Sequence, residues 1–315
     1  MFRSVPPVLG ANPTSPTRRK ILVLRGGALG DLVVTLPALA RLRERWPGAR
    51  ITLVGNATAG QLALNRGLIA ELFSQHEGRW AALHGTDPLP ASLGAWLAAF
   101  DLVVNFWSDP DGALRRHFPV RKGQVFVEAP ALPPPGSDPA AAHFQSALAP
   151  LSLHPGPLLY PIATAANASR EHSTIFIHPG SGSARKNWPL ANWLRVAREL
   201  PVRSVFILGE AEVPYWDAAG NATAGFTTLR GKNLEQIVAE LANCRLFLGH
   251  DSGISHLAAG CGARCLLLFG PTEPATWAPP SPLVRVLQAG ADLSALSPEF
   301  VLAAAQAHLA DQSSA

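Results

Sequence analysis

Short apolar runs alternate with segments of helical periodicity along most of the chain. Two stretches share one order of features: residues 21–55 (ILVLRGGALGDLVVTLPALARLRERWPGARITLVG) and residues 175–209 (IFIHPGSGSARKNWPLANWLRVARELPVRSVFILG). Each begins with an apolar run, turns at a glycine-rich corner, continues with helical periodicity to a proline, and ends in a second apolar run that stops at glycine. The proline and the last glycine lie equally far from the start in both stretches. Each has the length and order of a right-handed strand–helix–strand crossover.

The alternation continues outside these two stretches. Further strands are predicted at residues 101–107 (DLVVNFW), 123–129 (GQVFVEA), 227–231 (TTLRG), 245–249 (RLFLG), 265–270 (CLLLFG) and 283–288 (LVRVLQ). A helix is predicted over residues 233–244 (NLEQIVAELANC), and a last helix over residues 297–310 (SPEFVLAAAQAHLA). Ser297 is a suitable cap for this last helix, and Pro298 fits its first turn.

These elements predict an α/β protein with two open, mostly parallel sheets, one in each half of the chain. The expected boundaries are a disordered tail over residues 1–17, an N-terminal domain over 18–160 and a C-terminal domain over 161–315. The joint is expected within residues 130–172, which are rich in proline and alanine. The last helix belongs to the C-terminal domain or packs back on the N-terminal one. Loops at the carboxyl ends of the strands would line the cleft between the domains.

Composition narrows the classes of partner. Hydrophobic residues make up 48% of the chain and charged residues 15%, which is typical of a globular protein with a large core. The net charge of +4 suits anionic small molecules or a membrane surface and is too small to indicate nucleic acid. The three cysteines, Cys244, Cys261 and Cys265, form no Cys-x-x-Cys pair and are expected to be reduced. With no signal-peptide core and no apolar stretch of membrane-spanning length, a cytoplasmic protein is expected.

Two loops of the C-terminal half are suited to an anion. The segment HDSGISH (residues 250–256) follows a strand and starts a helix, so free backbone N–H groups and the positive end of the helix dipole point to the same place. Asp251 would position Ser252 and its neighbours or act as the N-cap of that helix. The segment HPGSGSARKNWP (residues 178–189) adds hydroxyls, glycines and Lys186, which either meets the anion or is an ordinary solvated lysine. The spacing of His178, His250 and His256 predicts hydrogen-bonded histidines rather than metal ligands.

The first corner, RGGALGDLV (residues 25–33), places Asp31 near a helix N-terminus. Asp31 is either an acid favoured there by the helix dipole or a cleft carboxylate that serves as a general base. The corner lacks the Gly-x-Gly-x-x-Gly pattern, and no acid follows the second strand, so a nicotinamide enzyme is not expected. Walker lysine, HExxH and Gly-x-Ser-x-Gly motifs are absent from the chain.

Three segments, taken together, closely resemble glycosyltransferase family 9, the ADP-heptose:lipopolysaccharide heptosyltransferases. They are residues 21–54, residues 177–193 (IHPGSGSARKNWPLANW) and residues 249–279 (GHDSGISHLAAGCGARCLLLFGPTEPATWAP). The resemblance implies a GT-B fold of two facing Rossmann-like domains. It also implies an inverting, metal-independent transfer without a cofactor, from a nucleotide-diphospho-sugar such as ADP-heptose to a glycolipid or glycan acceptor. The donor would bind the C-terminal domain and the acceptor the N-terminal one, with possible peripheral contact with the inner membrane surface.

The same resemblance implies roles for individual residues. Asp31 would take the proton from the acceptor hydroxyl, and Lys186 would bind the diphosphate. Further donor contacts would come from Ser181, Gly182, Ser183, Asp251, Ser252, Gly253 and His256, and the ribose would meet Glu210 or Glu212. On the acceptor side the expected residues are Arg25, Gly26, Gly27, Arg115 and Arg116.

The chain departs from the family pattern after the predicted strand at 101–107. Asn105, Trp107, Ser108 and Asp109 replace the usual Asp-x-Gln-Gly-like stretch, so the acceptor is the least determined part of this interpretation. A nearby basic cluster (Arg115, Arg116, Arg121 and Lys122) either meets phosphates of an acidic acceptor or forms a solvated surface. The alternatives for the whole chain are another GT-B enzyme with a different donor and a relative that binds sugar nucleotides without catalysis.

Overall fold

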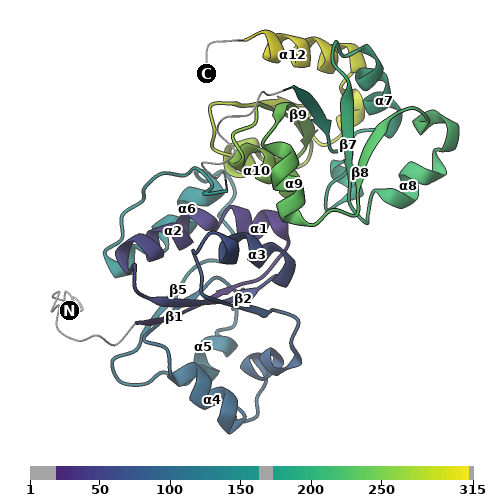
Figure 1. The fold of residues 1–315 in the computed structure, drawn as a ribbon. Helices are drawn as coiled ribbons and strands as arrows, with labels where there is room; N and C mark the ends of the chain where they lie inside the picture. Colours follow the sequence, from purple (N-terminus) through teal and green to yellow (C-terminus); the bar gives the residue numbers. More distant parts are fainter. Residues whose placement is uncertain (1–18, 163–172, 312–315) are drawn as a thin grey trace.

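The structure, a computed structural model, describes residues 19–162 and 173–311. The expected tail over residues 1–17 and the last part of the expected joint, residues 163–172, therefore lie outside the described residues. Each half of the chain contains one parallel sheet, and helices pack on the sheet faces (Figure 1). Along the described ranges, no helix is both long and apolar enough to cross a membrane.

The N-terminal sheet has the strand order β3-β2-β1-β4-β5, and all its pairs are parallel. Its strands are β1 (Lys20–Arg25), β2 (Arg50–Gly55), β3 (Glu71–Ser74), β4 (Leu102–Asn105) and β5 (Val125–Glu128). The accompanying helices are α1 (Leu29–Val33), α2 (Leu36–Arg45), α3 (Ala57–Asn65), α4 (Ala91–Ala98), α5 (Ala113–His117) and α6 (Ala140–Ser146), with 3₁₀ turns η1 (Gly78–His84) and η2 (Ala149–Leu151). The α6 helix packs on α2, so most of the proline- and alanine-rich region belongs to this half.

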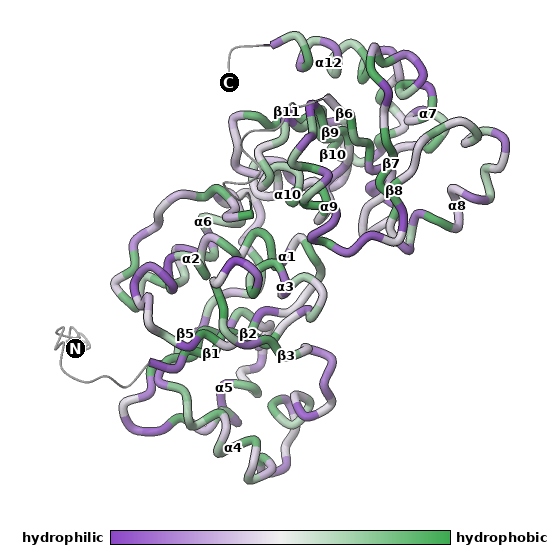
Figure 2. Tube along the Cα trace, viewed as in Figure 1, coloured by the Kyte–Doolittle hydropathy of each residue, from purple (hydrophilic) through white to green (hydrophobic). Residues whose placement is uncertain are grey.

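The C-terminal sheet has the order β11-β10-β9-β6-β7-β8 and is also parallel throughout. Its strands are β6 (Thr174–Ile177), β7 (Ser204–Leu208), β8 (Thr227–Arg230), β9 (Cys244–His250), β10 (Cys265–Phe269) and β11 (Val284–Gln288). Its helices are α7 (Leu190–Glu199), α8 (Val213–Ala218), α9 (Leu234–Leu241), α10 (Gly253–Gly260), α11 (Pro274–Trp277) and α12 (Pro298–Ala310), with 3₁₀ turns η4 (Ala184–Lys186), η5 (Gly220–Thr223) and η6 (Leu293–Ala295). The central strands are apolar, as a sheet covered on both faces requires (Figure 2).

The last helix confirms its predicted cap, because the Ser297 hydroxyl accepts a hydrogen bond from the Phe300 N–H. It packs on α7, β9 and β10 at the far end of the C-terminal half. The alternative that this helix returns to the N-terminal domain is therefore not what the structure shows. Its buried Val301 and Ala305 join an apolar cluster made of C-terminal side chains.

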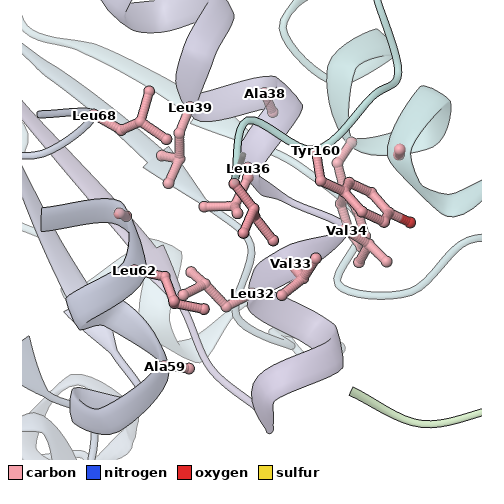
Figure 3. Close-up of a cluster of buried hydrophobic side chains, with 14 of the residues drawn as sticks. Leu32, Val33, Val34, Leu36, Ala38, Leu39, Ala59, Leu62, Leu68 and Tyr160 are labelled. Carbon is pink, nitrogen blue, oxygen red and sulfur yellow. The ribbon is translucent and has the colours of Figure 1, made fainter. Parts of the chain in front are cut away.

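The two halves meet through helices. α1 packs on α10, and α3 packs on α9 (Figure 1). One apolar cluster runs through this junction and contains the α1–α2 side chains drawn in Figure 3 together with Leu257 and Phe247 of the other half. A salt bridge of 2.7 Å between Arg66 and Glu235 also crosses the junction. Apolar and ionic contacts therefore hold the two halves together, with the carboxyl ends of both sheets facing one shared space.

Candidate active site

The site lies where the strand order reverses in each sheet. In the N-terminal sheet β1 lies between β2 and β4, and in the C-terminal sheet β6 lies between β7 and β9. At such a switch point neighbouring crossovers leave in opposite directions and open a crevice at the strand ends. The corner after β1 and the corners after β6 and β9 are the glycine-rich segments identified from the sequence.

A cavity of about 580 Å³ occupies the space between these corners. Its walls come from both halves of the chain. Nearly all the residues expected on the donor side line it, together with the expected base: Asp31, Ser181, Gly182, Lys186, Glu210, Glu212, Asp251, Ser252, Gly253 and His256. Ser183 does not line the cavity; it is the N-cap residue of η4. The volume is typical of a small-molecule site.

Asp31 is held firmly at the start of α1. Its Oδ2 accepts a hydrogen bond of 2.8 Å from the Ala28 N–H, and its Oδ1 lies 3.2 Å from Arg25 Nη2. The side chain remains 30% exposed, so one face of the carboxylate is open. Gly27 has φ of +106°, and a Cβ there would lie 2.3 Å from Asp31 Oδ2. Glycine is required at this corner, both for its left-handed backbone and for the close approach of the carboxylate.

Arg25 does not form an acceptor surface, which corrects the expectation from the sequence. The residue is 4% exposed, and its Nε donates to the Thr35 hydroxyl at 2.9 Å. Its guanidinium also stacks on Phe144, 4.5 Å from the ring centroid. Burial lowers the pKa of Arg25, and the charge of Asp31 opposes this shift. Arg25 is therefore a positioning residue for the Asp31 carboxylate.

The positive charge of Lys186 faces Asp251. Lys186 Nζ donates to Asp251 Oδ2 at 2.6 Å, so this lysine is not an ordinary solvated one. Asp251 is not the N-cap of α10; Ser252 has that position, and its hydroxyl accepts from the Ser255 N–H. Asp251 instead holds the lysine beside the α10 N-terminus.

His256 continues this polar chain into the domain junction. Its Nε2 lies 4.0 Å from Asp251 Oδ1, and its Nδ1 shares a hydrogen bond of 2.9 Å with the Tyr160 hydroxyl. Burial lowers the pKa of His256 to about 4. Burial also raises the pKa of Tyr160. Both side chains are thus neutral at pH 7, and their hydrogen bond joins the segment before β6 to α10.

His250 forms hydrogen bonds within the core, as its spacing predicted. Its Nε2 accepts from the Trp188 N–H at 2.8 Å, and burial lowers its pKa to about 3. His178 is also buried and hydrogen-bonded, as expected, and it lies on the cavity wall. Its Nδ1 lies 3.4 Å from the Ser252 hydroxyl and its Nε2 lies 3.7 Å from Glu212 Oε2.

Glu210 and Glu212 both line the cavity but differ in setting. Glu212 is buried and accepts from the Gly209 N–H at 2.9 Å, whereas Glu210 is exposed. Burial acts to raise the pKa of Glu212, but His178 and the Gly209 N–H outweigh it, so this pKa lies below its ordinary value. A Cβ at Gly180 would lie 2.0 Å from Glu212 Oε1, which explains the glycine in the HPG corner.

Sequence reasoning missed the apolar walls of the cavity. They include Leu29, Val34, Ile207, Ile237, Ile254 and Trp277. Their apolar character looks the same as that of core residues in the sequence, and only the three-dimensional arrangement separates the two groups.

A second cavity of about 510 Å³ lies in the N-terminal half at the same corner. Gly26 and Gly27, two of the expected acceptor-side residues, line it, together with side chains that include Gln75, Trp80 and Trp107. We call it the Trp107 pocket.

Arg115 and Arg116 line neither cavity. Arg115 lies over the Phe126 ring and 3.5 Å from Glu128, and Arg116 donates to the Asp111 carbonyl at 2.6 Å. Local groups therefore engage both guanidinium groups. Within residues 19–162 and 173–311, no group of three or more His, Cys, Asp and Glu side chains is arranged to hold a metal ion.

Comparisons with known proteins agree with this architecture. Residues 159–299 match the model of glycosyltransferase family 9 (heptosyltransferase). Lipopolysaccharide heptosyltransferase 1 of Salmonella typhimurium is 21% identical over 294 residues, which cover 81% of this chain and 89% of the relative. The enzyme of the same name from Pseudomonas aeruginosa is 24% identical over 287 residues, which cover 81% of this chain and 79% of the relative.

Solved structures show the same two-domain arrangement. A glycosyl transferase family 9 protein from Veillonella parvula superposes with a TM-score of 0.74 at 19% identity, covering 92% of this chain and 97% of that chain. The E. coli heptosyltransferase WaaC with ADP gives 0.69 at 17% identity, covering 92% and 99%. These likenesses confirm the GT-B fold. The family match and the two relatives show that the chain is similar to the heptosyltransferases of glycosyltransferase family 9.

Proposed function

We propose that this protein transfers heptose, or a similar sugar, from an ADP-linked donor to a hydroxyl of a lipopolysaccharide-type or other surface-glycan acceptor. The observation that carries the proposal is that Asp31 and Lys186, from opposite halves, line one cavity. A carboxylate and a cation on facing walls suit a reaction that removes a proton at one end and releases a diphosphate at the other.

The C-terminal wall supplies the groups that a leaving diphosphate needs. The first two residues of α10 (Gly253 and Ile254), Lys186 and the Ser181–Gly182 loop all line the cavity. Helix N-termini and lysine side chains stabilise phosphate oxygens, and their effect grows as the leaving group gains charge. This set of groups takes the place of a divalent cation. Glu212, which is fixed by Gly209, or the exposed Glu210 would take a ribose hydroxyl.

The N-terminal wall supplies the base. An acceptor oxygen attacks the anomeric carbon from the face opposite the diphosphate, while its proton moves to the solvent-exposed side of the Asp31 carboxylate. The carbon–oxygen bond to the diphosphate breaks, ADP leaves, and the configuration at the anomeric carbon inverts. Arg25 and the Ala28 N–H hold the Asp31 carboxylate in place during this step. General base catalysis of this kind contributes about 10²–10⁴-fold in rate.

Two measurements test the proposal. Calorimetric titration with ADP, UDP and GDP reports the base preference, and ADP release from ADP-heptose in the presence of glycan acceptors reports transfer. We expect ADP to bind more tightly than UDP or GDP and release to depend on acceptor. Tighter binding of another nucleotide would point to a different donor, and ADP binding without any release would favour a non-catalytic relative.

A further inference from the structure

The Trp107 pocket borders the Asp31 corner directly. Gln75 holds that corner from the pocket side: its Oε1 accepts from the Gly27 N–H at 3.0 Å, and its Nε2 donates to the Gly27 carbonyl at 3.3 Å. On the other side, Gly27 packs so closely on Asp31 that a Cβ would lie 2.3 Å from the carboxylate. One residue thus separates the pocket wall from the base. A molecule seated in the pocket needs to extend only past Gly27 to bring a hydroxyl to Asp31.

Aromatic rings form much of the pocket wall. His84 stacks on Trp107 with ring centroids 6.4 Å apart and an interplanar angle of 26°. Trp80 lies edge-on to Trp107 at 6.4 Å, but it is only 3% exposed, whereas Trp107 is partly exposed. Indole faces pack well against the C–H faces of sugar rings, and a few polar groups beside them fix orientation. Here the polar groups are Gln75, His76 and Glu77.

Neither lysine nor arginine is among the side chains that line this pocket. Arg79, which lies between Gly78 and Trp80 of the pocket, pairs with Glu77 at 2.8 Å, and its guanidinium lies 4.2 Å from the Trp80 ring centroid. A carboxylate or phosphate on a bound sugar would therefore find no free countercharge and would approach Glu77. Transfer of an anion to such a site without a partner is costly, whereas hydroxyl groups can pair with amide, imidazole and carboxylate groups.

The basic residues expected to meet an acidic acceptor add no positive charge to the wall of the Trp107 pocket. Arg115 and Arg116 are engaged by Phe126, Glu128 and the Asp111 carbonyl, and they do not line the pocket. We propose that the Trp107 pocket binds an uncharged sugar residue of the acceptor, stacked on Trp107, and presents its hydroxyl to Asp31. This inference rests on the proposed function and specifies the acceptor chemistry of the same site.

The test compares matched sugars in direct binding. Saturation-transfer NMR would be recorded with methyl glycosides of glucose, galactose and mannose, and with the corresponding methyl uronides, which differ by one carboxylate. The proteins are the wild type, Trp107→Ala, Trp107→Phe and, as a control for the basic cluster, Arg115→Ala/Arg116→Ala. Circular dichroism and ADP titration of each protein report folding and donor binding separately.

We expect at least one neutral glycoside to bind the wild type at least fivefold more tightly than its uronide. Trp107→Ala should weaken it at least tenfold, Trp107→Phe should retain most of the binding, and the double arginine variant should match the wild type. Tighter binding of the uronides, or binding that Trp107→Ala leaves unchanged, would overturn the inference while ADP binding persists. If Trp107→Ala does not fold, His84→Ala replaces it, with a severalfold loss expected and no loss counting against the pocket. Absence of ADP binding by the wild type would instead contradict the proposed function.

Discussion

Lys186 Nζ and Asp251 Oδ2 lie 2.6 Å apart on the C-terminal wall of the cavity, where the diphosphate is proposed to bind. The Asp251 side chain is 10% exposed, so the lysine compensates a nearly buried carboxylate. The lysine is 29% exposed and can reach a ligand without leaving its partner. Lys186 therefore neutralises Asp251 in the ligand-free protein and can also bind a phosphate oxygen of the donor.

Replacing Lys186 by alanine should weaken ADP binding about 10- to 100-fold, because a hydrogen bond to a charged group contributes about 1.5–3 kcal/mol. The same change should lower the free energy of unfolding, because Asp251 loses its partner. Adding Asp251→Asn should restore the stability but not the affinity. Calorimetry and denaturant titration on the four proteins of this double-mutant cycle measure both effects. Unchanged ADP affinity in Lys186→Ala would remove the lysine from the donor site.

The junction between α1 and α10 depends on a glycine contact. A Cβ at Gly253 would lie 2.8 Å from the Gly30 nitrogen, whereas a Cβ at Gly30 would meet Gly253 at an ordinary 3.6 Å. Gly253→Ala should therefore push the two halves apart and slow transfer at least about tenfold, since a displacement of the order of 1 Å at a site can cost 10²-fold.

The matched control is Gly30→Ala, which should be tolerated. Steady-state kinetics report the rates, and small-angle scattering reports the separation of the halves. Equal losses in the two variants would mean that the tight packing at Gly253 is not what sets the geometry of the cavity.

Acid should destabilise the protein through two buried histidines. Burial lowers the pKa of His250 to about 3 and of His256 to about 4, from an ordinary 6.5. Between the folded-state pKa values and 6.5, the unfolded chain binds more protons than the folded one. The free energy of unfolding is therefore highest above about pH 6.5 and falls as the pH decreases toward 4. Each histidine should contribute a slope of up to about 1.4 kcal/mol per pH unit.

Denaturant titrations from pH 7.5 to pH 5 would measure this slope. His256→Gln should reduce it, because the variant keeps a polar side chain near Tyr160 but binds no proton. His154→Gln, at an exposed position, is the control and should leave the slope as in the wild type. A wild-type stability that does not change over this range would contradict the buried, neutral state of these histidines.

Transfer should not require a divalent metal ion, since lysine and helix N–H groups take that role at the diphosphate. Dialysis against EDTA should leave the rate of ADP release within about twofold, because metal Lewis acids usually contribute several kcal/mol where they act. Loss of activity on chelation, with recovery on adding Mg²⁺ or Mn²⁺, would show that a metal takes part.

The sequence predicted the architecture well because the repeat of apolar runs, corners and prolines reports directly on strand–helix–strand units. It also identified the corners that carry Asp31, Lys186 and Asp251, since glycine and polar residues at strand ends are conspicuous. It could not show that Asp251 pairs with Lys186 or that Ser252 is the N-cap residue, because both depend on side-chain direction. The burial of Arg25 was missed because α6, which covers it with Phe144, is 115 or more residues away in sequence.

The acceptor side was the hardest to predict. Trp107 was noted only as a departure from the family pattern, yet the structure places it in a pocket beside Gly26 and Gly27. The pocket walls come from η1 and from the ends of β1, β3 and β4. No local pattern brings these segments together; the strand order of the sheet does.

The most direct test of the whole account is the rate of ADP release by Asp31→Asn, measured alongside its affinity for ADP. The asparagine keeps the size of the side chain and can still accept from the Ala28 N–H, but it cannot take a proton from the acceptor. The account predicts a rate lowered at least about 100-fold with ADP affinity within a few-fold of the wild type. A variant that transfers sugar as fast as the wild type would show that the carboxylate on the N-terminal wall is not the base.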